Sequence, residues 1–452
     1  MTNPTTQIAL KNTTTSSTVY AYITGLDINK DNAYAFLQPD GKTLYYPASP
    51  SQPLQPLAVD CAIPLGAPGT TITVTIPQLA GGRIWFVVGN KLTFFLNPGP
   101  GIVEPSVTNT DDVNYKLNWA FCEFTCVATL ANNVLYNNQD QLFVNISYVD
   151  FVALPIALEL LNTEGEVQTV LGLPTDGLDQ VCAQLTQQGA SENPGWAKLV
   201  VKGDDGKNLR ALSPNSGRIA DSTIFDGYYQ SYVDQAWTKY TSEDLKIDTQ
   251  AQWGVVAGRV DATTGLLSFP NAGTFAKPAA VDIFSCSTGP FGSYPEATRD
   301  EMGAIGARLA AALNRSTLVS NPDQPDAVQA DGSYDYYKTD PTNHYARILH
   351  GVNLDGRGYA FPYDDVTPSG ATGPDQAGTV FDGSPALLTV TVGGPGSSSG
   401  SADKGQDEKV GDGGEKNKDK SGGNKKEKKK SAFDFEGFFK KIMAMIKGIF
   451  HK

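Results

Sequence analysis

Two acidic residues lie among large apolar neighbours in segments whose side chains alternate as in strands. Along an extended strand, alternate side chains share one face. In residues 142–156, LFVNISYVDFVALPI, Asp150 falls on a face whose other seven members are apolar or aromatic. In residues 118–127, NWAFCEFTCV, Glu123 shares its face with Trp119, Phe121, Thr125 and Val127. Burying a carboxylate there costs several kcal/mol unless it is hydrogen-bonded, hydrated or functional.

Two carboxyl groups in apolar surroundings are what hydrolysis of a glycosidic bond requires. One carboxylic acid, with its pKa raised by desolvation, protonates the leaving oxygen. The other carboxylate stays ionised and either activates water or attacks the sugar. Acids at strand ends or on a hydrated cleft wall are also common, so alternation alone leaves a structural interpretation of Glu123 and Asp150 open.

A second polar cluster follows near the end of the globular region, in residues 356–366, GRGYAFPYDDV. Tyr359, Tyr363 and Asp364 suit sugar stacking and hydroxyl binding. A turn held by Arg357 is the simpler structural account.

No metal or cofactor is expected. The three histidines supply little material for a zinc site or a Ser/His/Asp triad. Phosphate-binding, dinucleotide-binding and calcium-binding sequence motifs do not occur. Cys286 lies between two serines in residues 282–292, with no histidine nearby in sequence, and this segment is interpreted as strand and turn.

The elements that must position these residues are mainly strands. Up to about residue 160, short alternating segments are separated by turn residues such as GAPGT and NPGPG, which predicts a β-sandwich or barrel over residues 1–165. Residues 166–345 form a mixed α/β, helix-rich part. Residues 346–394, which include ARILHGVNL, GRGYAFPYDDV and ALLTVTVGG, are expected to return to strands and complete the β domain. A cleft is predicted where these parts meet.

Three helices are predicted within the mixed part. The first carries Leu178, Val181, Cys182 and Leu185 at helical spacing. The second carries an aromatic stripe that indicates core packing more than a sugar platform: Tyr229, Tyr232, Val233, Ala236, Trp237 and Tyr240. The third is expected to open with a capping box formed by Thr298 and Glu301.

The C-terminal sequence has a different composition. Residues 395–431 are rich in Gly and Ser and then in mixed charges, which predicts a disordered linker. Residues 432–452 form a basic amphipathic helix after a polybasic run, so they suit docking to an anionic membrane surface or to a protein partner. A helix that only caps the globular domain is the alternative.

Charge and cysteine content exclude several classes of protein. The chain has 452 residues and a net charge of −13, and residues 1–400 hold 21 basic and 39 acidic residues, a balance of −18. An acidic body disfavours nucleic acid as a partner. The five cysteines have no metal-ligand spacing, and a disulfide framework is not expected. The polar N-terminus does not resemble a signal peptide, so a location inside the cell, or export by another route, is expected.

Several segments together resemble glycoside hydrolase family 64, the β-1,3-glucanases related to thaumatin-like proteins. They are CEFT, VNISYVDFVALPIAL, DIFSCSTGPF, ATRDEMGAIGARLAAALNRSTL, HYARILHGVNLDGRGYAFPYDDV and ALLTVTVGG, in this order over residues 5–394. The resemblance implies a thaumatin-like β-sandwich beside a mixed α/β part, with a wide groove for a β-1,3-glucan chain. It further implies an inverting enzyme that releases short oligosaccharides, typically the pentamer.

The resemblance also implies roles for individual residues. Glu123 matches the family's general acid and Asp150 its general base, while Thr125 matches a threonine that lines the sugar site. The chain departs from the family in residues 124–149, which include what looks like an inserted loop without tryptophan. The second departure is the missing signal peptide, because the family is typically extracellular.

The sequence therefore predicts a monomeric, inverting, endo-acting β-1,3-glucanase whose partner is a glucan chain. The main alternative is a non-catalytic, thaumatin-like glucan-binding module, tethered by residues 432–452 to a membrane or a partner. A third hypothesis treats the globular part as a scaffold for that helix.

Overall fold

The computed structural model describes residues 5–127, 141–326, 334–369 and 376–395. Residues Met1–Gly396 form one compact unit, and Ser397–Lys452 are assigned to a second one. The linker and terminal helix predicted for residues 395–452 lie, from residue 396 onward, outside the described residues. Within the described ranges, no helix has the length and apolar character that crossing a bilayer requires.

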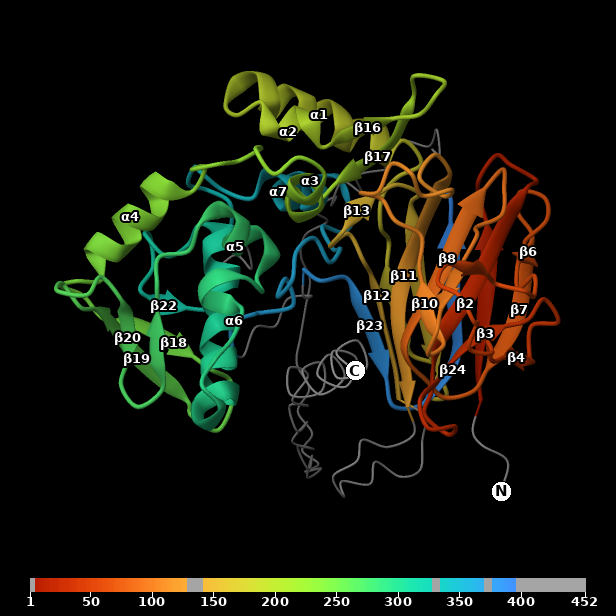
Figure 1. Cartoon of the computed structure of the whole chain (residues 1–452), viewed down its shortest axis with the longest axis horizontal. Helices are drawn as coiled ribbons and strands as arrows, with labels where there is room; N and C mark the ends of the chain where they lie inside the picture. The colour runs from red at the N-terminus through yellow and green to blue at the C-terminus, as the bar shows by residue number, and fades with distance from the viewer. Residues whose placement is uncertain (1–4, 128–140, 327–333, 370–375, 396–452) are drawn as a thin grey trace, which may run out of the picture. The chain divides into compact units, whose positions relative to one another are not determined.

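Two large sheets make up the β part of the first unit (Figure 1). The five-stranded sheet has the order β15 (Val167–Val170), β14 (Ile156–Asn162), β24 (Pro385–Val392), β1 (Thr6–Asn12) and β7 (Thr71–Ile76). The eight-stranded sheet has the order β23 (Thr379–Asp382), β12 (Gln141–Ile146), β11 (Asn118–Val127), β8 (Leu79–Val88), β2 (Val19–Asp27), β3 (Ala33–Leu37) and β4 (Leu44–Tyr45), with β6 (Ile63–Pro64) paired to β2.

The two sheets face each other across an apolar core. Thr6 on β1 and Cys126 on β11 are linked directly, with 3.2 Å between Oγ1 and Sγ. Cys122 and Phe124 share the face of Cys126 and are buried in the same core. Because side chains alternate, Glu123 and Thr125 must lie on the opposite face of β11. The five cysteines all lie in the described ranges, and all are buried and free.

Smaller sheets and the helices complete the unit. A three-stranded sheet contains β10 (Gly101–Val103), β9 (Phe95–Asn97) and β5 (Gln55–Pro56), and another contains β13 (Phe151–Val152), β17 (Asn208–Leu212) and β16 (Val200–Lys202). A five-stranded sheet contains β21 (Gly273–Phe275), β20 (Leu267–Phe269), β19 (Val255–Val260), β18 (Leu245–Asp248) and β22 (Asp323–Gln324). The described α-helices are α1 (Gly177–Ser191), α2 (Gly195–Lys198), α3 (Pro214–Ala220), α4 (Gln230–Lys239), α5 (Ala280–Ser285), α6 (Arg299–Arg315) and α7 (His344–Val352). Two short 3₁₀ helices are η1 (Gly289–Phe291) and η2 (Glu296–Thr298).

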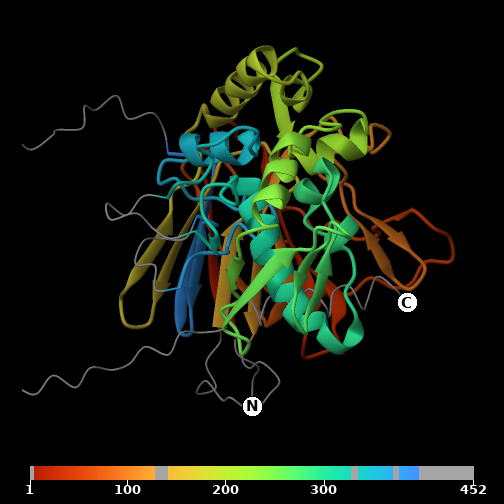
Figure 2. The ribbon, with the colours of Figure 1, turned by 90° about the vertical axis from the view of Figure 1, so that its left-hand side faces the viewer.

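The mainly β fold with a mixed α/β part is confirmed, and so are the three helices predicted from spacing. Helix α6 packs beside β18 (Figures 1 and 2). The aromatic stripe on α4 is core packing, since Tyr232, Val233, Ala236 and Trp237 are each at most 2% exposed. The capping box is wrong, because the Thr298 side chain makes no capping hydrogen bond at the start of α6.

Residues 142–156 do not form the single strand that alternation suggested. Strand β12 ends at Ile146, and the two residues of β13 join a different sheet. After Ile146 the backbone turns to meet another segment: the Tyr148 amide donates to the carbonyl of Tyr359 at 2.7 Å. Asp150 therefore lies in a bend between strands, and the shared face that first singled it out is not present.

The return to strands after residue 345 is correct only in part. Strands β23 and β24 join the two large sheets as expected. The first seven residues of ARILHGVNL instead lie in α7, whose Asn343 side chain accepts a capping hydrogen bond from the Ala346 amide at 3.1 Å. The buried face of α7 contains Tyr345, Ile348, Leu349 and Val352 at helical spacing. Burial of this face outweighs the preference of the β-branched residues for strands. In residues 356–366 only Tyr359 forms a bridge, to Ser147, and turns follow.

Candidate active site

Glu123 projects from the middle of the eight-stranded sheet, on the face opposite the sandwich core. Its direct neighbours across the strands are Arg83 on β8 and Asn145 on β12. Further along the same face of β11, Trp119 and Phe121 pack against Trp85, with ring centroids 5.7 and 4.9 Å away. These aromatic residues fix the strand, so the position of Glu123 is set by a rigid sheet.

Arg83 holds Glu123 by two nitrogen atoms. Nη2 lies 3.2 Å and Nε 3.3 Å from Oε1 of Glu123. The guanidinium also lies over the ring of Phe121, with its carbon 4.5 Å from the ring centroid. The side chains of Arg83 and Glu123 are 27% and 33% exposed, so the pair is only partly hydrated.

A third charged residue, Glu104, completes this cluster. It follows β10 and forms a short ion pair with Nη1 of Arg83. Its other carboxylate oxygen accepts a hydrogen bond from the Tyr34 hydroxyl at 3.1 Å. Burial, and next the charge of Glu104, raise the pKa of Tyr34 well above its usual range, so this phenol stays neutral and donates.

Asp150 belongs to the same charged cluster. Burial raises the pKa of its carboxyl; the positive charge of Arg83 lowers it, and the charges of Glu123 and Glu104 raise it further. Charges on partly buried groups are screened by salt much less than charges on exposed groups. The charges of Arg83, Glu123 and Glu104 thus all act on the carboxyl group of Asp150.

Two contacts hold Asp150 in its bend, one made by its own backbone and one by the next residue. The backbone carbonyl of Asp150 accepts a hydrogen bond from the Ser213 amide at 2.9 Å. The next residue, Phe151, packs edge-on against Trp119 with ring centroids 4.7 Å apart, and lies 5.9 Å from Phe121. The aromatic face of β11 therefore positions both acids, Glu123 directly and Asp150 through Phe151.

Thr125 is on the same face of β11 as Glu123, two residues further along. It is 5% exposed, and its Oγ1 accepts a hydrogen bond from the Gly81 amide of β8 at 3.3 Å. Because Oγ1 is the acceptor in that bond, the Thr125 hydroxyl does not use its own hydrogen in it.

The structure separates the three residues predicted from residues 356–366. Tyr359 pairs with the segment that leads to Asp150, because its backbone forms a bridge with Ser147. Its hydroxyl donates to the Asp365 carboxylate at 3.0 Å. Tyr363 is half-buried in a turn with φ 70° and packs against the apolar core.

Asp364 is fully buried, which corrects its predicted role in hydroxyl binding. Its side chain is 0% exposed and lies 3.1 Å from Nη2 of Arg315 and 3.0 Å from Nε2 of His350. Burial alone would raise the pKa of Asp364, but the charges and hydrogen bonds of His350 and Arg315 lower it overall. A carboxylate sealed between two basic side chains has no surface for a sugar, so Asp364 is a core residue.

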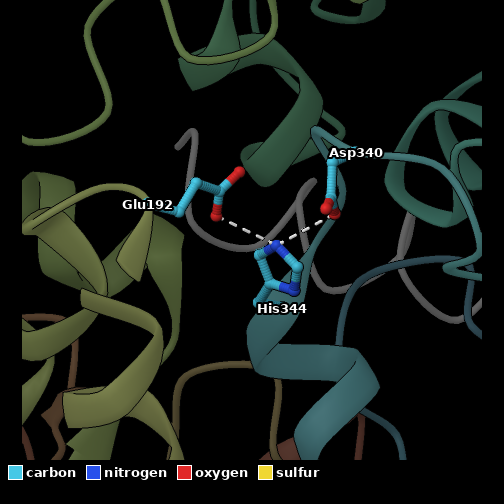
Figure 3. Close-up of side chains that lie close together, drawn as sticks. All are labelled: Glu192, Asp340 and His344. Atoms are coloured by element: carbon cyan, nitrogen blue, oxygen red, sulfur yellow. Dashed lines mark ion pairs between the residues drawn. The ribbon is translucent and has the colours of Figure 1, made fainter. Parts of the chain in front are cut away.

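A separate cluster of His344, Glu192 and Asp340 has the residue types of a metal site (Figure 3). Nε2 of His344 lies 3.0 Å from Glu192 and 3.3 Å from Asp340. Nδ1 accepts a hydrogen bond from Nε of Arg347 at 2.9 Å. The proton of a neutral imidazole is therefore on Nε2, directed at the carboxylates, and the lone pair that a cation needs is not available there. Among the described residues this cluster is a hydrogen-bonded link between the end of α1 and α7.

Arg83 and Glu104 were missed from the sequence. Arg83 carried the same signal as Glu123, a charge alternating with large apolar residues in GRIWFVV. Glu104 carried none, because it reaches the cluster only through the way β10 folds back beside the sheet.

Paired carboxyl groups are the groups that most glycoside hydrolases use to break a glycosidic bond. Comparison with known proteins specifies the class further. The family model of glycoside hydrolase family 64, β-1,3-glucanase, matches residues 4–392. The chain belongs to this family.

Individual relatives agree with the family assignment. A glucan endo-1,3-β-glucosidase of Cellulosimicrobium cellulans is 30% identical over 302 residues, which are 66% of this chain and 50% of that protein. The chain thus aligns with about half the length of this curated relative. A laminaripentaose-producing β-1,3-glucanase, solved with laminaritetraose, matches with a TM-score of 0.71 and 29% identity over 86% of this chain and 98% of that one. A β-1,3-glucanase domain from Clostridium beijerinckii shares the fold, with a TM-score of 0.64 and 20% identity over 86% of this chain and 100% of that domain.

Proposed function

We propose that the chain is an endo-acting β-1,3-glucanase that hydrolyses its substrate with inversion of configuration. Glu123 is the general acid and Asp150 is the general base. The observation that carries this proposal is the aromatic face of β11, which carries Glu123 beside Arg83 and packs against Phe151, the residue that follows Asp150. The family membership and the laminaritetraose complex of a relative support a β-1,3-glucan as substrate.

The environment of Asp150 suits a base. A carboxylate abstracts a proton from water more readily when its pKa lies closer to the working pH. Burial raises the pKa of Asp150, while Arg83 limits the rise and so favours the ionised form that a base needs. Water activated by Asp150 attacks the anomeric carbon as Glu123 protonates the departing oxygen. For inversion, the two carboxyl groups must be roughly 6.5–9.5 Å apart to admit that water.

Thr125 and Tyr359 are proposed to contact the glucan beside these acids. Thr125 retains a hydroxyl hydrogen on the face of Glu123, and Tyr359 lies beside the segment that leads to Asp150. Tyr363 is the weaker candidate because it packs against the core. The proposed products are short laminari-oligosaccharides.

Substitution of either acid tests the reaction. Glu123→Gln and Asp150→Asn preserve the size of each side chain and remove its proton chemistry. Each change is expected to lower laminarin hydrolysis at least a hundredfold, because general acid–base catalysis contributes about 10²–10⁴ in rate. Reducing-end assays and thermal unfolding of the purified variants measure activity and folding.

The matched control is Glu159→Gln, which removes an exposed carboxylate from β14 on the other large sheet. It is expected to retain wild-type activity. Near-normal hydrolysis by Glu123→Gln or Asp150→Asn contradicts the assignment. Laminarin binding without hydrolysis by the wild-type chain indicates a non-catalytic glucan-binding module instead.

A further inference from the structure

The contact between Glu123 and Arg83 poses a problem for a general acid. A guanidinium within hydrogen-bonding distance stabilises the ionised form of a carboxyl group. The proposed role of Glu123 requires the opposite form, a carboxyl group that holds a proton until the glycosidic oxygen needs it. Some feature of the site must therefore offset the charge of Arg83.

Glu104 is placed to do so. Its carboxylate forms an ion pair with Nη1 of Arg83, while Nη2 and Nε of the same guanidinium face Glu123. One positive charge is thus shared between two carboxyl groups. The negative charge of Glu104 also acts directly on Glu123, and both effects make ionisation of Glu123 less favourable.

The geometry keeps Glu104 on this side of the guanidinium. Tyr34 donates a hydrogen bond to its other oxygen at 3.1 Å. Phe121 supports the face of the Arg83 guanidinium at 4.5 Å. Glu104 and Glu123 therefore approach separate nitrogen atoms of Arg83 and do not displace each other.

We propose that Glu104 is a positioning residue. Its ion pair with Arg83 offsets part of the positive charge of the guanidinium, so that Glu123 can carry the proton delivered to the leaving group. This inference rests on the proposed function, in which Glu123 is the general acid. The charged groups around it on the described elements are Arg83 of β8, Glu104 after β10 and Asp150 before β13. Tyr34 of β3 and Cys122 of β11 are neutral, because burial raises the pKa of each. Asn145, across from Glu123 on β12, carries no charge.

The test is the pH dependence of kcat/KM for laminarin hydrolysis by Glu104→Gln. Without the charge of Glu104, the positive charge of Arg83 acts on Glu123 without an offset. Glu123 is therefore expected to lose its proton at lower pH. The alkaline limb of the profile, which reports the acid in the free enzyme, is expected to move to lower pH by about one unit. On that limb the rate then falls about tenfold relative to the wild type, since a shift of one unit changes the protonated fraction tenfold.

A purely structural role for Glu104 predicts a different result. Activity then falls by the same factor at every pH, and the alkaline limb stays where it is in the wild type, which overturns the inference. Glu159→Gln is the matched control, because it makes the same chemical change on an exposed strand and is expected to leave the profile unchanged.

Two further variants keep the test decisive. If Glu104→Gln does not fold, Glu104→Asp keeps the charge but withdraws it from Arg83, and a smaller shift in the same direction is expected; no shift overturns the inference. Glu123→Gln separates the inference from the proposed function. An inactive Glu123→Gln together with an unmoved limb in the Glu104 variant rejects only the inference, whereas an active Glu123→Gln rejects the proposed function itself.

Discussion

At the scale of single residues, the sequence identified which acids stand in unusual surroundings but not what surrounds them. Glu123 was found by alternation along a continuous strand, and β11 does place it on the face of Trp119 and Phe121. Asp150 was found by an alternation that the structure does not contain, and only the resemblance to a family supported its selection. Arg83 and Glu104 depend on strand register and on a loop path, and neither is encoded in local spacing.

Asp364 provides a stability prediction at this scale. Replacement by Asn leaves Arg315 and His350 without their buried negative partner. Asp364→Asn is expected to lower the free energy of unfolding by about 3–5 kcal/mol, as is usual when one partner of a buried ion pair is removed. Chemical denaturation at neutral pH measures the change, with Glu159→Gln as the control.

The pH dependence of this effect has a defined sign. The pKa of Asp364 is lower in the folded chain than its ordinary value of 3.8. The resulting stabilisation is therefore fully present above pH 3.8 and is lost as pH falls through the folded-state pKa. Wild type and Asp364→Asn should differ most in stability above that pH and converge below it. A loss of hydrolysis with unchanged stability contradicts a core role and returns Asp364 to the substrate site.

At the scale of elements, long amphipathic segments were predictable and interrupted ones were not. Helices α1, α4 and α6 followed from apolar spacing, since each buries one face or more against the core. Helix α7 was taken for a strand because its nine residues mix branched and polar side chains, and its capping residue Asn343 was overlooked. The division of residues 142–156 depends on a hydrogen bond from Tyr148 to Tyr359, a pairing across two hundred residues that no local pattern reveals.

The link between β13 and β11 gives a prediction for an element. Phe151 connects the bend of Asp150 to Trp119 and Phe121. Phe151→Leu keeps an apolar side chain but removes the edge-on aromatic contact, which is worth about 0.5–1.5 kcal/mol beyond its buried area. Hydrolysis is expected to fall about tenfold or more, because small displacements of reacting groups are costly.

Phe269→Leu is the matched control for this change. Phe269 is 1% exposed and packs against Phe275 in the sheet of β18–β22. The Phe269→Leu variant is expected to lose about as much stability as Phe151→Leu without a specific loss of activity. Thermal unfolding and laminarin hydrolysis measure the two effects. Equal losses of activity in both variants show that Phe151 has no special effect on Asp150.

At the scale of the whole molecule, composition and the order of segments were informative, while the assembly of sheets was not. The mainly β class and the membership of family 64 agree with what the sequence indicated. The division into residues 1–165, 166–345 and 346–394 stays a prediction, as does the cleft between the parts. The basic helix of residues 432–452 lies outside the described residues and also stays a prediction.

Membrane docking by that terminal segment can be measured directly. A chain that ends after Gly394 lacks the polybasic run and the amphipathic sequence. The full chain is expected to sediment with vesicles that contain phosphatidylserine and to lose this association at high salt or after truncation. Laminarin hydrolysis by the truncated chain serves as the control for folding. Equal sedimentation of both chains excludes the segment as the cause.

Strand β24 has a consequence for how the protein is made. It lies between β14 and β1, and it is parallel to β1, from which it is separated by more than 370 residues of sequence. During translation the five-stranded sheet cannot close until residues 385–392 have left the ribosome. Until then the nascent chain carries two unpaired strand edges, which are surfaces for aggregation. Synthesis that stops before Val392 should therefore yield an aggregating polypeptide, and chaperone assistance should matter most in the last steps of translation.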